Sequence, residues 1–286
     1  MPSIHRRMLL LSAAALSLPS HAADAFDFQG MEKRCGGKLG VSIVDTASGR
    51  HFGWRQDERF PFCSSFKAPL AAFVLWQADQ GALRLEDPVA YGQADLLSYA
   101  PVAREHAGRG FMTVQALCAA AVELSDNTAT NLLLKLTGGP QALTAWMRSQ
   151  GDPEFDLSDN EPGLNLARFG DRRNTTTPRA MCASYRRFAF ADALAPASRE
   201  RLRAWLIASP TGAKRLRAGL PSNWQAGDKT GTFNGPWFST IDVAIAMPPE
   251  RAPIVIAAFV TDTPDTATAE RAMVEVARKV ALQRAG

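Results

Sequence analysis

Ser64 and Lys67 are spaced so that the lysine can activate the serine hydroxyl as a nucleophile. Side chains three positions apart on a helix point from the same face, which brings the lysine beside the serine hydroxyl. A lysine in a partly desolvated cleft has a lowered pKa and can accept the hydroxyl proton. The same spacing is expected about once by chance in a chain of this length. Alone, it favours an ordinary helix start with a solvated lysine.

Three other short segments carry polar groups suited to proton transfer and binding. Residues 125–127 (Ser-Asp-Asn) supply a hydroxyl and an amide, although such residues also form ordinary helix caps. Glu161 and Asn165 lie in a long polar segment, where a carboxylate is usually only solvated. Residues 229–232 (Lys-Thr-Gly-Thr) end a predicted strand, where a lysine beside a glycine can meet a ligand or can simply protect a sheet edge.

The sequence has few residues that could support metal binding, catalysis by histidine or nucleic-acid binding. Beyond residue 22 the histidines are His51 and His106, and no HExxH or CxxC spacing occurs, so neither a zinc site nor another cofactor is expected. No GxSxG segment occurs either, so the base is not expected to be a histidine. Without residues 1–22 the formal charge is +2 and no basic block remains, which argues against a nucleic-acid partner.

The first 22 residues have the pattern of a signal peptide. Arg6 and Arg7 precede an apolar run from Met8 to Leu18, and Ser20 and Ala22 have the spacing that a signal peptidase recognises. The sequence therefore predicts an exported, periplasmic protein, sent through the general secretory or the twin-arginine route. After residue 22 no apolar run is long enough to span a bilayer, so no membrane anchor is expected after processing.

Four cysteines follow the predicted signal peptide. In an oxidising compartment they allow three full disulfide pairings, and their spacing selects none of these. Buried thiols packed as small hydrophobic groups are an equally good interpretation. The four are Cys35, Cys63, Cys118 and Cys182.

Strand patterns lie at both ends of the chain and helical patterns lie in its middle. We expect strands at 38–45, 50–56, 223–232, 241–247 and 254–261, and helices within 63–83, 112–150, 178–207 and 266–285. This order predicts an α+β two-lobe fold, in which an antiparallel sheet flanked by helices receives an inserted all-α lobe. The α/β lobe is assigned to 23–62 and 212–286, and the helical lobe to 63–211, including a polar loop at 152–177. A site is expected in the cleft between the lobes.

The four motifs gain weight from their order. SxxK, SDN, ExxLN and KTG occur once each in this order, separated by about 60, 35 and 65 residues. The combination of SxxK, SDN and KTG with a glutamate is the set found in class A β-lactamases and penicillin-binding proteins. The sequence resembles a class A serine β-lactamase over essentially the whole chain after residue 22. The resemblance is densest at 125–152 and extends to 59–67 and 95–102.

This resemblance implies a catalytic role for each motif. Ser64 would attack the lactam carbonyl and become acylated, with Lys67 and Glu161 as the candidate bases. Ser125 would pass a proton to the departing lactam nitrogen. Glu161 and Asn165 would hold the water that hydrolyses the acyl-enzyme. The substrates implied are small β-lactams, and the protein is expected to be a monomer.

The resemblance also implies a set of substrate-binding groups. The backbone N–H groups of Ser64 and Thr232 would form the oxyanion hole. Asn127 would bind the substrate's side-chain amide, and Tyr99 would form a wall of the cleft. The anchor for the substrate carboxylate would consist of Lys229, Thr230, Thr232 and Arg215.

Some positions depart from the family pattern. The two positions of the ion pair that commonly ties the glutamate-bearing loop are occupied by Asp159 and Asn174, so this pair cannot form, although Arg172 or Arg173 offers another partner for Asp159. We expect a looser loop that admits bulky substrates but positions the water less well. Two disulfides seen in the family are not expected, because each lacks its second cysteine. The family's partner position for Cys118 holds Ala71, and the partner position for Cys63 holds Phe233. Pro69 is expected to remove one hydrogen bond from its helix and to bend it.

Two other functions fit parts of this pattern. A penicillin-binding D,D-peptidase shares the serine, the lysine and KTG, but has no need of the ExxLN segment. A β-lactam sensor would be acylated and stay acylated, but usually carries a membrane-linked signalling segment. Turnover of a chromogenic cephalosporin separates the hydrolase from both.

Overall fold

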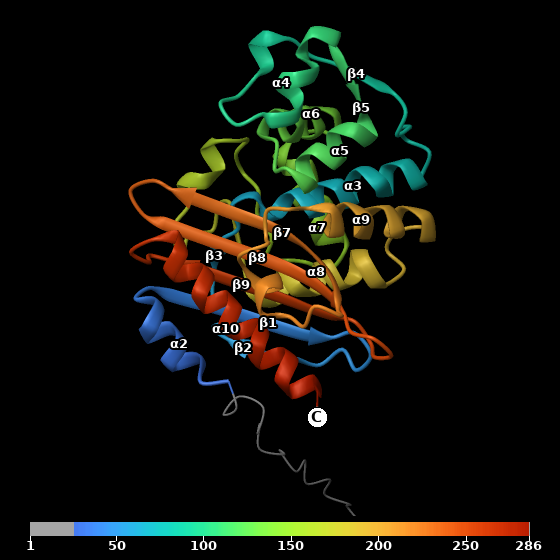
Figure 1. The fold of residues 1–286 in the computed structure, drawn as a ribbon. Coiled ribbons are helices and arrows are strands. Elements are labelled where there is room, and N and C mark those ends of the chain that lie inside the picture. The colour runs from blue at the N-terminus through green and yellow to red at the C-terminus, as the bar shows by residue number, and fades with distance from the viewer. Residues whose placement is uncertain (1–25, 286) are drawn as a thin grey trace, which may run out of the picture.

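The centre of the fold is a five-stranded sheet built from the two ends of the chain (Figure 1). A computed structural model describes residues 26–285, so the signal peptide predicted at 1–22 lies outside the described residues. The strand order is β2-β1-β9-β8-β7, and all neighbours are antiparallel. The strands are β1 (Lys38–Asp45), β2 (His51–Trp54), β7 (Gln225–Asn234), β8 (Phe238–Met247) and β9 (Ile254–Thr261). The predicted strands are therefore confirmed, with shifts of a few residues at their ends.

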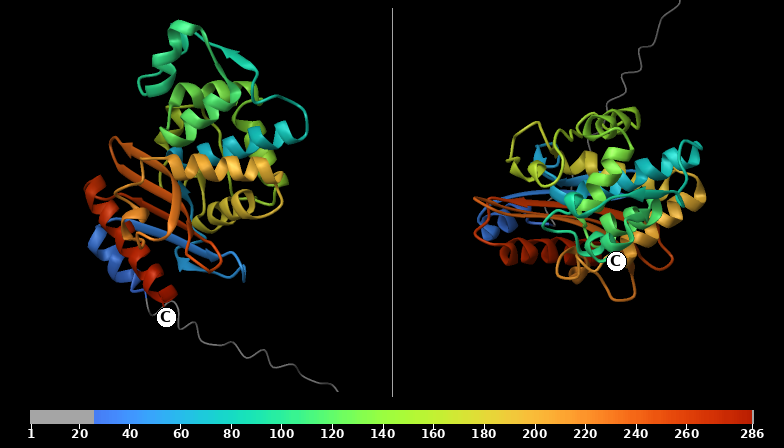
Figure 2. Two further views of the ribbon diagram at one scale, coloured as in Figure 1. Left: turned by 45° about the vertical axis from the view of Figure 1, so that its right-hand side comes forward. Right: turned by 90° about the horizontal axis from the view of Figure 1, so that it is seen from above.

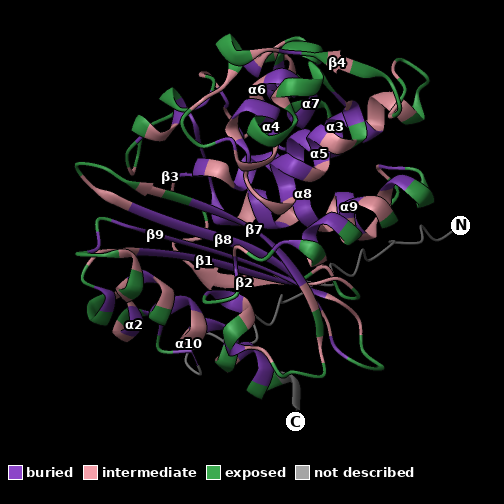
Figure 3. Cartoon of the chain, turned by 45° about the horizontal axis from the view of Figure 1, so that its top comes forward, coloured by how far each residue is buried: buried purple, intermediate pink, exposed green. Residues whose placement is uncertain are grey.

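The first and last strands of the chain lie side by side in the middle of the sheet. β1 pairs with β9 through eight residue pairs, from Lys38 opposite Thr261 to Asp45 opposite Ile254. Strands β1, β8 and β9 are buried along nearly their whole length (Figure 3). Such strands have near-continuous apolar sequences because both faces of the sheet are covered.

Two helices from the chain ends cover one face of the sheet (Figure 2). They are α2 (Phe28–Cys35) and α10 (Thr266–Ala285), which pack around Met31 and Met273. The short helix α2 was not predicted. It begins at Asp27, whose side chain accepts a hydrogen bond from the backbone N–H of Gly30, and it ends at Gly36 in a left-handed conformation.

The other face of the sheet is covered by the helical lobe. Its main helices are α3 (Lys67–Asp79), α5 (Val114–Glu123), α6 (Asn127–Leu136), α7 (Pro140–Ser149), α8 (Pro178–Phe190) and α9 (Pro196–Ala208). A short helix α4 (Pro101–His106) and the two-stranded pair β4 (Pro88–Ala90) and β5 (Phe111–Thr113) lie at its outer end. The two-lobe prediction is confirmed, and the limits of the lobes stay predictions.

The structure refines two helix predictions. The helical segment predicted at 178–207 consists of two helices, because the chain leaves α8 after Phe190 and Pro196 starts α9. The helix that carries Lys67 starts as a 3₁₀ turn, η1 (Cys63–Phe66), before α3. Pro69 therefore lies in the first turn of α3, where N–H groups have no partner within the helix. The carbonyl oxygen of Ser65, four residues before Pro69, accepts a hydrogen bond from the Tyr185 hydroxyl at 2.8 Å. The bend predicted for this helix stays a prediction.

Hydrogen bonds and an ion pair tie the polar loop 152–177 together at its neck, and the looser loop stays a prediction. The Asn174 side chain accepts hydrogen bonds from the N–H groups of Ser158 and Asp159, at 2.9 and 3.1 Å, and donates one to the Asp159 carboxylate at 2.7 Å. Arg173 forms the predicted ion pair with Asp159, at 2.9 Å. The strands β3 (Phe60–Pro61) and β6 (Thr175–Thr176) pair beside this neck. An amide thus replaces the family's ion pair.

The four cysteines all occur as buried free thiols, so no disulfide joins Cys35, Cys63, Cys118 and Cys182. This agrees with the interpretation as small packing groups. No helix within residues 26–285 combines the length and the apolar character that crossing a membrane requires.

Candidate active site

The turn that carries Ser64 is pressed against strand β7. Ser64 lies in η1, directly after Cys63, whose φ of 44° is unusual for a residue with a side chain. A Cβ atom added to Gly231 of β7 would lie 2.7 Å from the carbonyl oxygen of Phe62 and 3.0 Å from the Ser64 nitrogen. The glycine of the KTG segment is thus needed for the close approach of the strand to the serine turn.

Lys67 and Glu161 lie together beneath Ser64. The Lys67 Nζ is 2.9 Å from Glu161 Oε1, and the Ser64 hydroxyl donates to the same oxygen at 3.2 Å. Lys67 also donates to the carbonyl oxygen of Ser125 at 2.9 Å and to Asn127 Oδ1 at 2.5 Å. The Lys67 side chain is fully buried, and this burial lowers its pKa although Glu161 acts in the opposite direction.

The position of Glu161 is fixed by two asparagines. Asn165 donates to Glu161 Oε2 at 2.8 Å. Asn131 of α6 accepts from the backbone N–H of Glu161 at 3.0 Å and donates to its carbonyl oxygen at 2.9 Å. Sequence reasoning missed Asn131, although a signal was present: it lies four residues after Asn127, on the same face of α6.

Ser125 connects the two buried lysines. Its φ of 59° turns the chain sharply at the end of α5, and its hydroxyl accepts from Lys229 Nζ at 3.1 Å and lies 3.4 Å from Lys67 Nζ. Burial and the nearby charge of Lys67 lower the pKa of Lys229 to about 7. The hydroxyl of Ser125 therefore lies between two lysines whose pKa values are both depressed.

Asp126 joins α6 to the loop that carries Tyr99. One oxygen of the Asp126 carboxylate caps α6 at the N–H of Ala129, and the other accepts from Val102 and Ala103 at 2.9 Å each. The Asn127 N–H donates to the Tyr99 carbonyl oxygen at 3.0 Å. These bonds hold Tyr99 at the rim of the cleft, where its side chain is exposed.

Arg215 reaches β7 from the preceding turn. It donates to the carbonyl oxygens of Gly231 and Ile241, at 3.0 and 2.8 Å, and to the Thr232 hydroxyl at 2.7 Å. The Thr230 hydroxyl donates to Thr211 at 2.8 Å. Sequence reasoning proposed Arg215 for this location but did not find Thr211.

A cavity of about 460 Å³ brings these groups together. Most of the predicted site residues line it, whereas Lys67 and Lys229 are buried behind it. Three further lining residues were not predicted as site residues: Thr211, Gly231 and Asn234. The lining residues that had been predicted are Ser64, Tyr99, Ser125, Asn127, Glu161, Asn165, Arg215, Thr230 and Thr232.

Fold and cavity together define a two-lobe serine hydrolase, with a serine, two lysines and a glutamate at the junction of the lobes. The chain matches the model of the Beta-lactamase enzyme family over residues 25–283. It therefore belongs to the β-lactamase family, in class A, and is a β-lactam-hydrolysing enzyme. The resemblance noted in the sequence is confirmed.

Individual relatives agree over most of the chain. The sequence is 44% identical over 259 residues to Beta-lactamase AST-1 of Nocardia asteroides, covering 91% of this chain and 83% of that protein. It is 41% identical over 290 residues to Carbapenem-hydrolyzing beta-lactamase KPC of Klebsiella oxytoca, covering 99% and 98%. The solved structure of an ancestral class A β-lactamase has a TM-score of 0.87 and 51% identity, covering 90% of this chain and 98% of that one.

Proposed function

We propose that the enzyme opens the β-lactam ring of penicillins and cephalosporins through an acyl-enzyme on Ser64 and so confers resistance to them. The observation that carries this proposal is the contact of Ser64 Oγ with Glu161 Oε1, at 3.2 Å, in a carboxylate that Lys67 also approaches at 2.9 Å. A hydroxyl, a base and a cation thus meet at the wall of one cavity.

Acylation begins with loss of the Ser64 proton. Glu161 accepts a hydrogen bond from this hydroxyl, whereas Lys67 donates to Ser125 and Asn127 and pairs with Glu161 itself. This geometry favours Glu161 as the acceptor of the proton, with Lys67 holding the carboxylate in place. The Ser64 oxygen then bonds to the lactam carbonyl carbon, and the backbone N–H groups of Ser64 and Thr232 stabilise the resulting oxyanion.

The lactam C–N bond breaks when its nitrogen receives a proton. Ser125 supplies it, because its hydroxyl lies 3.1 Å from Lys229 Nζ and 3.4 Å from Lys67 Nζ, either of which can return a proton to Ser125. The products of this step are an ester on Ser64 and a free amine in the opened ring.

Hydrolysis of that ester requires a water held by Glu161 and Asn165. Asn165 donates to Glu161 Oε2 and so directs the carboxylate toward the cavity. Glu161 first passes the proton taken from Ser64 to Lys67, at 2.9 Å, which replaces the proton that Lys67 returned to Ser125. The carboxylate then takes one proton of the water as the water oxygen attacks the ester carbonyl carbon, and it gives that proton to the Ser64 oxygen when the ester C–O bond breaks. The glutamate-bearing loop is therefore what distinguishes a hydrolase from a protein that only traps its ligand.

The substrate is held by groups on both sides of the serine. Its carboxylate is bound by Thr230 and Thr232, with the positive charges of Lys229 and Arg215 behind them. Asn127 uses its oxygen to accept from Lys67, which leaves its NH₂ group for the carbonyl of the substrate's side chain. Tyr99 forms the opposite wall.

The wider setting of the enzyme is also part of the proposal. The leader at residues 1–22 supports export, so the protein is proposed to act in the periplasm, without a membrane anchor and as a monomer. The name of the Klebsiella oxytoca relative includes carbapenem hydrolysis. A kinetic panel of a penicillin, an oxyimino-cephalosporin and a carbapenem tests how far the substrate range of this chain extends.

The test uses the purified protein and a chromogenic cephalosporin. Sustained turnover is expected, with no covalent labelling by penicillin in Ser64→Ala. In Glu161→Gln, which keeps the shape of the side chain, Lys67 loses its carboxylate partner and can still accept the Ser64 proton, whereas the hydrolytic water has no base. This variant should therefore accumulate an acyl-enzyme visible as a mass increase. A single stoichiometric burst from the unmodified protein would instead indicate a sensor or a D,D-peptidase and would refute the proposed hydrolysis.

A further inference from the structure

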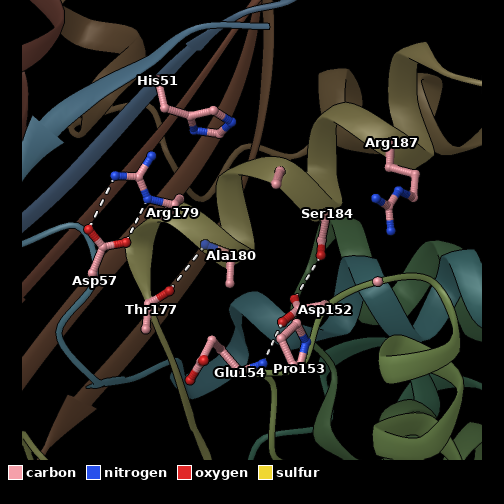
Figure 4. A pocket seen from close by; sticks show the side chains of 12 residues that line it. His51, Asp57, Asp152, Pro153, Glu154, Thr177, Arg179, Ala180, Ser184 and Arg187 are labelled. Carbon is pink, nitrogen blue, oxygen red and sulfur yellow. Dashed lines mark hydrogen bonds and ion pairs between the residues drawn. The ribbon is translucent and has the colours of Figure 1, made fainter.

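A second cavity, of about 340 Å³, shares no lining residue with the cleft at Ser64. Its floor is one face of α8, and its two walls are formed by β2 with the following turn and by the segment 151–154 (Figure 4). The size lies at the lower end of the range for small-molecule pockets. The floor residues follow the spacing of one helix face: Ala180, Ala183, Ser184 and Arg187.

Most of the charges around this cavity are paired with one another. Asp57 accepts two hydrogen bonds from Arg179, at 2.6 and 3.1 Å (Figure 4). The carboxylate of Glu154 is 2.6 Å from Arg59, outside the cavity. Neither acidic side chain therefore has a charge left to balance a cationic ligand.

The third carboxyl group, of Asp152, is held by neutral donors. It accepts from the Ser184 hydroxyl at 2.8 Å and from the N–H groups of Phe155 and Glu154 at 3.0 and 3.1 Å. Burial raises the pKa of Asp152 and so disfavours its charged form. The Asp152 carboxyl group thus stabilises the segment 151–154 and is not available to bind a ligand.

Arg187 differs from these groups. Within residues 26–285 its guanidinium has no ion pair or hydrogen bond, although its side chain is half-buried. It lies against the backbone at Gly151, where an added Cβ would be 2.8 Å from Arg187 Nη1. A guanidinium that lines a pocket and has no partner among the described residues offers a fork of N–H donors that matches a carboxylate.

The opposite wall of the cavity, which carries His51, also has a positive electrostatic potential. Burial and the guanidinium groups of Arg179 and Arg186 lower the pKa of His51, and Asp57 does not offset them. A neutral imidazole in a positive field gains a proton more easily when an anion enters the cavity. His51 can therefore report on such an anion.

We propose that this cavity binds a small organic monocarboxylate. Its carboxylate pairs with Arg187, and its apolar body lies over Ala180 and Ala183 and against Pro153. A phosphate ion lacks the apolar part, and a cation meets the unpaired guanidinium, so both are poorer ligands.

The test titrates the protein with benzoate and follows the histidine ring resonances by NMR. Saturating benzoate is expected to raise the pKa of His51, whereas the ring resonances of His106, which does not line the cavity, should not respond to benzoate. The neutral isostere benzamide should produce no such rise. Arg187→Ala should weaken benzoate binding about tenfold or more, because it removes a charge-assisted hydrogen bond.

Two control variants make the result specific. Arg187→Lys keeps the charge and should retain part of the affinity, and Arg271→Ala, on α10 outside the cavity, should bind as the unmodified protein does. Unchanged cephalosporin turnover shows that each variant is folded. Equal binding of benzamide, or equal benzoate affinity in Arg187→Ala, would overturn the proposal. So would a benzoate effect that appears only as competition in the Ser64 cleft.

Discussion

The pKa of about 7 at Lys229 leads to a specific pH dependence of catalysis. Burial and the charge of Lys67 lower this pKa, so the free enzyme loses the Lys229 ammonium as the pH rises through about 7. A substrate carboxylate favours the charged form and therefore binds the protonated enzyme. The value of kcat/KM for a carboxylate-bearing substrate should fall about tenfold per pH unit above this pKa, or about 100-fold by pH 9.

Lys229→Arg isolates the contribution of this residue, because an arginine stays charged throughout that range. The assay measures kcat/KM for a cephalosporin between pH 6 and 9 at constant ionic strength. The alkaline decline should disappear in Lys229→Arg, whatever its absolute activity. The same decline in this variant would assign the titration to another group, such as Lys67, and would refute the reasoning.

Three other predictions concern residues that support the site. Asn131→Ala should slow deacylation about 100-fold through misplacement of Glu161, so that an acyl-enzyme accumulates in intact-mass spectra; unchanged steady-state turnover would contradict this role. Asn174→Ala should lower the free energy of unfolding in urea by about 2 kcal/mol, whereas Arg173→Ala, which breaks an exposed ion pair, should cost less than about 1 kcal/mol; equal losses would show that the amide is not the main tie. Gly231→Ala should slow penicillin labelling of Ser64, whereas Gly92→Ala, whose added Cβ meets nothing within 4 Å, should not; equal labelling rates would count against the close approach of β7.

The strands were predictable from the sequence because their patterns are strong and local. The segment 38–45 became β1 and 254–261 became β9, with the predicted limits. Helix α2 was missed because its eight residues make only about two turns, too few for a helical pattern to stand out. Its stability comes from packing on the sheet and on α10. The break between α8 and α9 was missed although Pro196 marks it.

The site was predictable where a residue belongs to a short motif with its own chemistry. Ser64, Lys67, Ser125 and Glu161 were placed in this way. Asn131 and Thr211 act by holding other residues, and their positions depend on how α6 and the segment before β7 approach the site. The neck of the 152–177 loop shows a further limit, because side-chain types indicated a missing ion pair but not the hydrogen bonds that replace it.

The pairing of β1 with β9 has a consequence for when the enzyme can fold during its synthesis. These partners stand more than two hundred positions apart, so a nascent chain cannot complete its central sheet until almost all of it has been synthesised. Ser64 leaves the ribosome long before the strand that carries Lys229 and the strands that brace it. The activity should therefore appear late and all at once, and a chain shortened before Ile254 should have none.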